Sequence, residues 1–166
     1  MNDWLRDLIA RHRSAGVLVD TNILLLWFVG LFDPAQIPKF KRTAKFTPED
    51  YGLLHEFLDR FVRIVTTPNI LTETCNLAGQ LPDWAKDRCA PLLTRRITAM
   101  DETYVESGVA AQSEEFPRFG LTDSGIIGLA RGKFLVLTDD FKLSTFLARS
   151  GCDVINFNHL RPQAWS

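Results

Sequence analysis

The sequence has no long hydrophobic run and no excess of positive charge. Its longest uncharged apolar stretch, residues 21–32, is too short to span a bilayer. The N-terminal stretch MNDWLRDLIARHR is charged throughout and lacks the apolar core of a secretory signal. With 19 Lys and Arg against 20 Asp and Glu, the formal net charge is −1, so any nucleic-acid contact requires a local basic patch. These absences predict a cytoplasmic protein that makes no membrane contact.

Cysteine is also scarce. Cys75, Cys89 and Cys152 are an odd number and lack the spacing of a metal site, so we expect reduced thiols in a cytosolic protein. The chain contains no internal repeat, low-complexity tract or linker. A length of 166 residues with 46% apolar residues therefore predicts one globular domain over residues 1–166.

Short apolar runs alternate with helical patterns along the chain. Strands are expected over residues 16–20, 62–66, 134–138 and 154–157. Helices are expected within 1–15 and over 22–29, 48–61, 68–78, 84–96, 105–112, 122–130 and 143–150. This alternation predicts an α/β fold, a three-layer sandwich with a central parallel sheet and helices on both faces.

A basic-aromatic insert, residues 33–47, interrupts this alternation. It contains two prolines and is expected to form a loop or a short irregular helix. Four cations and two Phe within it could grip phosphates and stack RNA bases, although a solvated basic loop is the more economical interpretation. The candidate RNA-contact residues are Lys39, Lys41, Arg42 and Lys45.

Acidic residues cluster at one predicted edge of the sheet. Asp20 ends the first strand, and Asp139 and Asp140 follow the third. Glu73 and Asp123 lie early in helices that open onto the same edge, where ligands bind in parallel sheets. Crowded carboxylates repel one another, and the usual compensation is a divalent cation. Oxygen ligands without Cys or His favour Mg²⁺ or Mn²⁺, which suits phosphodiester hydrolysis.

Each acid also has a structural interpretation. An Asp at a strand end or helix start often caps free backbone N–H groups, and Asp123 and Asp140 are both placed to do so. Glu73, inside a helix, is harder to explain in this way. Convergence of four acids on one edge favours the functional interpretation.

Four short motifs resemble those of PIN-domain nucleases, in the same order. VLVDTNIL at 17–24 is similar to the opening strand with its D-T-N, and TPNILTE at 67–73 to the helix that carries a Glu. LTDSGIIGLA at 121–130 looks like the third motif, in which an Asp opens a compact helix. LVLTDD at 135–140 looks like the fourth motif, T-x-D. Each motif alone is weak, but all four in order are strong. The resemblance covers residues 17–157, while the N-terminal helix and the long insert depart from the small toxin-type members.

This resemblance implies a metal-dependent endoribonuclease that uses Mg²⁺ or Mn²⁺ to hydrolyse single-stranded or structured RNA. The acids that it assigns to the metal are Asp20, Glu73, Asp123 and Asp140. Asp139 is the alternative fourth ligand, and Asn22 and Thr138 would orient a carboxylate or a bound water. The commonest bacterial setting is the toxin of a toxin–antitoxin pair, which adds an antitoxin protein and a homodimer to the expected partners. An orphan RNA-processing or defence nuclease is the alternative.

Other function classes fit the sequence less well. A haloacid-dehalogenase-type phosphatase needs Asp-x-Asp after its first strand, but Asn22 occupies the second acidic position. A receiver-type signalling domain needs an acidic pair after the first strand, whereas the pair here follows a later strand. A degenerate PIN scaffold that binds RNA or a protein without cutting remains the non-enzyme alternative, although none of the four acids is missing.

Overall fold

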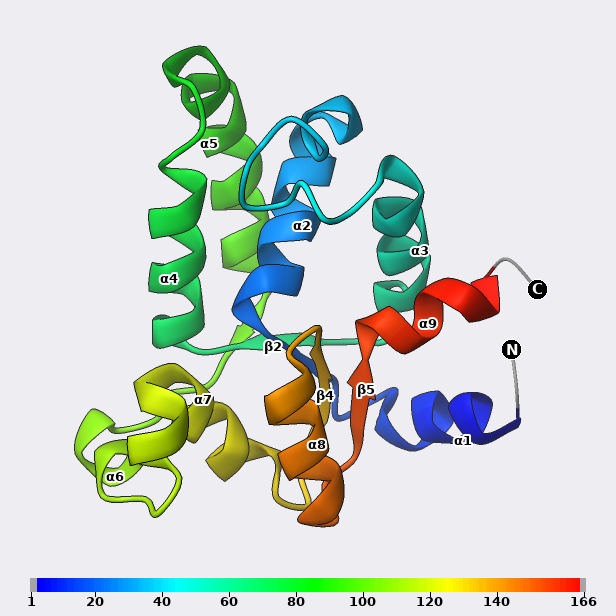
Figure 1. The fold of residues 1–166 in the computed structure, drawn as a ribbon, viewed down its shortest axis with the longest axis vertical. Coiled ribbons are helices and arrows are strands. Elements are labelled where there is room, and N and C mark those ends of the chain that lie inside the picture. The colour runs from blue at the N-terminus through cyan, green and yellow to red at the C-terminus, as the bar shows by residue number, and fades with distance from the viewer. Residues whose placement is uncertain (1–2, 165–166) are drawn as a thin grey trace.

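A computed structural model describes residues 3–164, with the backbone alone for 162–164. Its five-stranded sheet is entirely parallel, in the order β3-β2-β1-β4-β5 (Figure 1). The strands are β1 (Val17–Val19), β2 (Ile64–Thr66), β3 (Asp101–Glu102), β4 (Leu135–Thr138) and β5 (Val154–Asn156). Helices flank the sheet, so the predicted α/β sandwich is confirmed.

All but the first and last helices connect successive strands. They are α1 (Asp3–His12), α2 (Thr21–Phe32), α3 (Pro48–Leu58), α4 (Pro68–Ala78), α5 (Asp83–Ala99), α6 (Ser107–Ala111), α7 (Phe116–Ala130), α8 (Phe141–Arg149) and α9 (Phe157–Ala164). Figure 1 shows α2 to α5 gathered on one side of the sheet and α7 with α8 on the other. No helix in the described part of the chain is long and apolar enough to cross a membrane.

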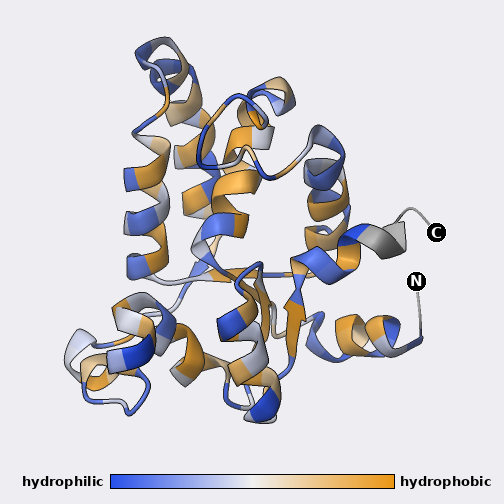
Figure 2. Cartoon of the chain, viewed as in Figure 1, coloured by the Kyte–Doolittle hydropathy of each residue, from blue (hydrophilic) through white to orange (hydrophobic). Residues whose placement is uncertain are grey.

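The core is centred on β1 and α2. All three residues of β1 are fully buried, as a parallel strand covered on both faces requires. α2 buries residues 23–30 and packs against α3, α4 and α5, so it is apolar around most of its circumference (Figure 2). The buried helix expected after the first strand is therefore confirmed, and it anchors the segment that begins at Asp20.

Two predicted helix starts are also confirmed. Thr47 and Asp50 form a reciprocal capping box at α3, with N–H to oxygen distances of 3.2 and 2.9 Å. At α4, the Thr67 hydroxyl accepts the Ile70 N–H at 3.2 Å. These caps set where each helix leaves the sheet, and the second one fixes the first turn of the helix that carries Glu73.

The structure adds two elements that the sequence pattern does not predict. β3 consists of two exposed acidic residues at the edge of the sheet, so it has no apolar alternation to mark it. α9 begins at Phe157, which the apolar pattern assigns to the last strand. The side chain of Asn156 accepts the Asn158 N–H at 3.0 Å, and this local bond ends β5 and turns the chain into the helix.

Two predicted helices differ in detail. α7 begins at Phe116 and not near Thr122, but Gly120, with a φ of 79°, kinks it, so the predicted helix corresponds to its second half. α1 is confirmed, although Trp4 in its first turn is 58% exposed. The buried side of α1 is formed by Leu5, Leu8 and Ile9.

The insert forms a short 3-10 helix, Pro34–Gln36, followed by turns, as predicted. Its two rings, Phe40 and Phe46, are buried, and Phe46 packs edge-on against Phe157. These rings therefore offer no surface to RNA bases, which corrects the base-stacking hypothesis for this run. Its four cations remain exposed.

Candidate active site

The candidate site lies where the order of the strands reverses. β1 and β4 are parallel neighbours, with Val17 opposite Leu135 and Val19 opposite Leu137. From β1 the chain moves outward to β2 and β3 before it returns to β4 on the other side. In open parallel sheets, ligands bind at the carboxyl ends of the strands at such a switch point. Asp20 follows β1 there, and Thr138 ends β4.

Asp20 is held rigidly and is poorly solvated, with only 6% of its surface exposed. Thr138 Oγ1 donates to one of its oxygens at 2.6 Å, and the Thr21 N–H donates to the other at 2.6 Å. Burial, helped by the charges of Asp139 and Asp140, raises the pKa of Asp20 to about 6, although these two hydrogen bonds act to lower it. The carboxylate is thus fixed in orientation at an electrostatic cost.

Glu73 of α4 joins this site through two threonine hydroxyls. Thr21 Oγ1 donates to Glu73 Oε2 at 3.0 Å, and Thr122 Oγ1 donates to Glu73 Oε1 at 2.6 Å. Both carboxylate oxygens are therefore oriented, one from the start of α2 and the other from α7. Sequence reasoning missed these roles of Thr21 and Thr122, although each lies next to a predicted acid.

Asp123 lies in the second half of α7, just after the kink. Within residues 3–164 its carboxylate accepts no hydrogen bond from the protein, so the capping role that the sequence allowed is not observed. Burial raises its pKa to about 7, helped by the charges of Asp20, Asp140 and Glu73, whereas Lys142 lowers it. The four predicted acids thus share one electrostatic environment.

The two acids after β4 have different surroundings. Asp140 caps α8 by accepting the Leu143 N–H at 2.9 Å, which confirms the structural role considered for it. Its carboxylate is nevertheless exposed, and its charge acts on both Asp20 and Asp123. Asp140 therefore has one role in the helix and remains available for a second role in the site.

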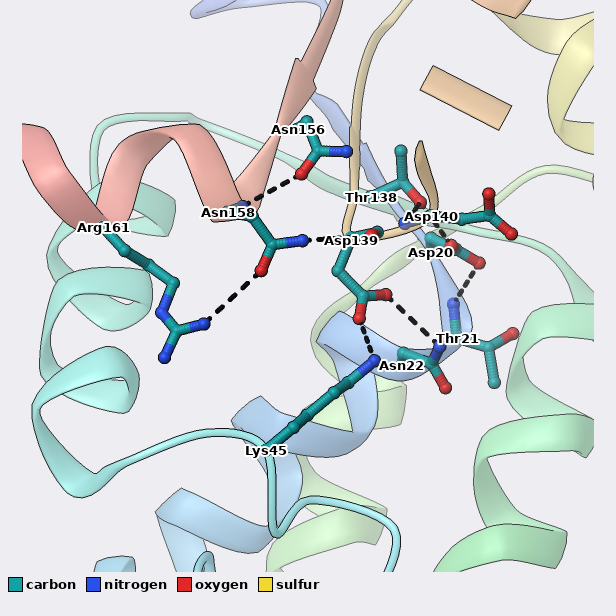
Figure 3. A network of polar contacts seen from close by, with 10 residues as sticks. All are labelled: Asp20, Thr21, Asn22, Lys45, Thr138, Asp139, Asp140, Asn156, Asn158 and Arg161. Carbon is teal, nitrogen blue, oxygen red and sulfur yellow. Dashed lines mark hydrogen bonds and ion pairs between the residues drawn. The ribbon is translucent and has the colours of Figure 1, made fainter. Parts of the chain in front are cut away.

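Asp139 faces the insert (Figure 3). Its side chain is 3% exposed and forms an ion pair with Lys45, while Asn22 donates to its other oxygen at 3.2 Å. Asn158 donates to its backbone carbonyl at 3.1 Å. Asp139 is paired with Lys45, whereas the exposed Asp140 acts through its charge on both Asp20 and Asp123, so Asp140 is the better candidate for the fourth acid.

The remaining predicted contact residues lie apart from this network. Arg42 Nε donates to Gln80 Oε1 at 2.8 Å, whereas Lys39 and Lys41 are exposed to solvent. Of the four cations in the insert, Lys45 is the one that the structure joins to the acids. The insert is therefore tied to the site through a single side chain.

A second polar network, which sequence reasoning missed, reaches the backbone of Asp139 through Asn158. Arg161 of α9 donates to Asp50 of α3 at 2.8 Å and to Asn158 at 3.4 Å. Asn156 also donates to Ser144 of α8 at 2.9 Å. The sequence signal for α9 is short: Phe157 and Leu160, both buried, are spaced by three residues, as on one face of a helix.

The donor chemistry of the four acids suits a hard divalent cation. As the side chains stand, no group of three or more His, Cys, Asp or Glu among the described residues has a metal-holding arrangement. Yet the acids offer only oxygen donors, and their mutual repulsion is what a cation relieves. Two buried hydroxyls, Ser124 Oγ beside Asp123 and Thr66 Oγ1 at the end of β2, also lack a partner within residues 3–164. The site is thus compatible with a cation and its waters.

No protein-family model matches the chain, and no curated protein matches it either. The likeness to PIN-domain nucleases therefore depends on the four short motifs and on the chemistry of the residues within them.

Lys45→Met is expected to lower the free energy of unfolding at pH 7 by about 1 kcal/mol. The substitution leaves the buried carboxylate of Asp139 without its cation, while the 55% exposure of the Lys45 side chain limits the effect. Urea denaturation measures the difference, and Lys41→Met, from the same run, is the matched control. Equal stability of the two variants would show that the ion pair contributes nothing.

Proposed function

We propose that this protein is a metal-dependent endoribonuclease that hydrolyses RNA phosphodiester bonds with Mg²⁺ or Mn²⁺. The observation that carries the proposal is the electrostatic coupling of four carboxylates from separate segments at the switch point of the sheet. Stability alone explains them poorly, because carboxylates that repel one another weaken a fold, and Asp20 is buried while Asp123 is partly buried.

The chain's own residues have distinct parts in this proposal. Asp20, Glu73, Asp123 and Asp140 would hold the cation, which when bound activates a water and neutralises charge on the phosphate. Thr138 orients Asp20, and Thr21 with Thr122 orients Glu73. Asp123 accepts no hydrogen bond from the described residues, so both of its carboxylate oxygens remain open to the cation or to one of its waters.

The proposal includes the cellular setting. A cytoplasmic RNA is the expected substrate, and the motif resemblance suggests the toxin of a toxin–antitoxin pair, acting alone or as a homodimer. A neighbouring gene for a small DNA-binding protein would favour the toxin over an orphan nuclease, and its absence would favour the orphan nuclease.

A catalytically inactive scaffold is the competing function. The specific observation in its favour is that the acidic, His and Cys side chains described here do not already form a metal-holding group. Such a protein would bind RNA or a protein partner through the same face without cutting. Metal binding therefore separates the two functions.

Incubation with mixed single-stranded RNA in Mg²⁺, Mn²⁺ or EDTA tests the proposal. We expect cleavage by the wild-type protein with either metal, and none in EDTA or by Asp20→Asn. Thermal unfolding of Asp20→Asn checks that it is folded. A wild-type protein that neither cleaves RNA nor binds Mn²⁺ would refute the nuclease and favour the scaffold.

A further inference from the structure

One aromatic side chain beside the site faces solvent. Phe141 is 71% exposed, follows Asp140 directly and is the first residue of α8. The inward face of this helix is formed by Leu143 and Leu147, both fully buried, so α8 packs without the Phe141 ring. The ring is therefore free to meet a ligand next to a candidate metal-binding carboxylate.

Two cations lie on the same side of the site. Lys142 follows Phe141, and its Nζ donates to the Arg118 carbonyl at 2.8 Å. Lys142 and Arg118 both contact the ring of Phe119, at 4.9 and 5.0 Å from its centre. Neither is in an ion pair within residues 3–164, and the charge of Lys142 lowers the pKa of Asp123. These cations thus remain available to an anion that approaches the acids.

We propose that Phe141, Lys142 and Arg118 form a docking strip for single-stranded RNA along the α7–α8 side of the site. An unpaired base stacks on the Phe141 ring, and the two cations contact the phosphates beside it. The proposal rests on the nuclease function and names its substrate class, RNA with an unpaired base next to the scissile phosphate. A duplex hides the faces of its bases, so the strip selects against it.

The surroundings of the ring favour RNA over a protein partner. A stable dimer buries about 800 Å² on each partner around an apolar centre. Here the exposed ring of Phe141 lies in the chain between the carboxylate of Asp140 and the cation of Lys142, with no other large apolar side chain exposed on α8. Proteins commonly bind single strands with an aromatic ring that stacks on a base and cations that contact the phosphates. Phe40 and Phe46 of the insert are buried and cannot stack on a base.

The test measures binding of a labelled mixed-sequence RNA by fluorescence anisotropy, in an Asp20→Asn background with Mg²⁺, so that no cutting occurs. Phe141→Ala is expected to weaken single-strand binding about tenfold, and Phe141→Trp to retain it. Trp4→Ala removes an exposed ring from α1, which joins Asp153 at the amino end of β5 through His12, away from the carboxyl ends where the acids lie, and is expected to change nothing. Lys142→Ala should reduce the salt dependence of binding by about one counterion.

Equal affinity of Phe141→Ala and its parent for the single strand would overturn the strip. A change from dimer to monomer in Phe141→Ala, seen by sedimentation, would overturn it as well and assign the ring to a subunit contact. Wild-type cleavage is measured in parallel. Cleavage without a Phe141 effect refutes the strip alone, whereas Phe141-dependent binding without cleavage supports the strip and refutes the nuclease.

Discussion

Asp123→Asn is expected to stabilise the metal-free protein at pH 8 by about 2 kcal/mol. Burial, helped by three neighbouring carboxylates, raises the pKa of Asp123 from 3.8 to about 7. The folded state therefore binds this proton more tightly than the unfolded chain, and the free energy of unfolding falls as pH rises from about 4 to about 7. The full shift corresponds to about 4 kcal/mol, which partial exposure of the side chain reduces by about half.

Urea denaturation in EDTA, at several pH values between 4 and 8, measures this gain. The gain should shrink as the pH falls and become small near pH 4, where Asp123 is protonated in the folded state and about half protonated in the unfolded chain. Asp87→Asn, at an exposed position of α5, is the matched control and should show no such trend. A gain that is independent of pH would contradict the electrostatic explanation.

Function should change in the opposite direction. Asp123→Asn is expected to lower metal-dependent RNA cleavage by about 100-fold or more, because it removes one of the four negative charges that would hold the cation. Saturating Mg²⁺ should stabilise the wild-type protein and leave the variant almost unaffected. A variant that is both more stable and fully active would remove Asp123 from the proposed site.

Thr138→Val is expected to weaken Mn²⁺ binding by about 10- to 100-fold. The Thr138 hydroxyl donates to Asp20 at 2.6 Å and accepts the backbone N–H of Asp140 at 3.0 Å, so one side chain orients the Asp20 carboxylate and holds the backbone at Asp140. Valine keeps the shape but not the hydroxyl, and Asp20 then loses the hydrogen bond that most opposes its raised pKa. A proton therefore competes more strongly with the cation.

Calorimetric titration with Mn²⁺ at pH 6.5 and 8 measures this effect. The loss of affinity should be larger at the lower pH, where more of the variant's Asp20 is protonated. Thr138→Ser retains the hydroxyl and serves as the control, with affinity close to that of the wild-type protein. Equal affinities of the Val and Ser variants would show that the hydroxyl does not support the site.

The four acids illustrate how far sequence reasoning reaches. Asp20 and Asp140 were predictable because each directly follows an apolar run, and the carboxyl ends of parallel strands meet at one edge. Glu73 and Asp123 were predictable because each lies in the opening turns of a recognisable helix. The hydrogen bonds from Thr21 and Thr122 to Glu73 were not predictable, because the three residues lie in segments far apart in the chain.

By itself the sequence determined the alternation of strands and helices, the parallel sheet and the edge at which the acids gather, because apolar periods, caps and turns are local signals. Only the tertiary structure decided that Asp139 pairs with Lys45, that Phe40 and Phe46 are buried, and that Phe141 is exposed. Pairing and exposure depend on which distant segments pack together. The sequence of the insert is the same whether Phe40 and Phe46 face solvent or the core. Likewise, Asp139 and Asp140 cannot be told apart by sequence, because only the folded chain brings Lys45 to one of them.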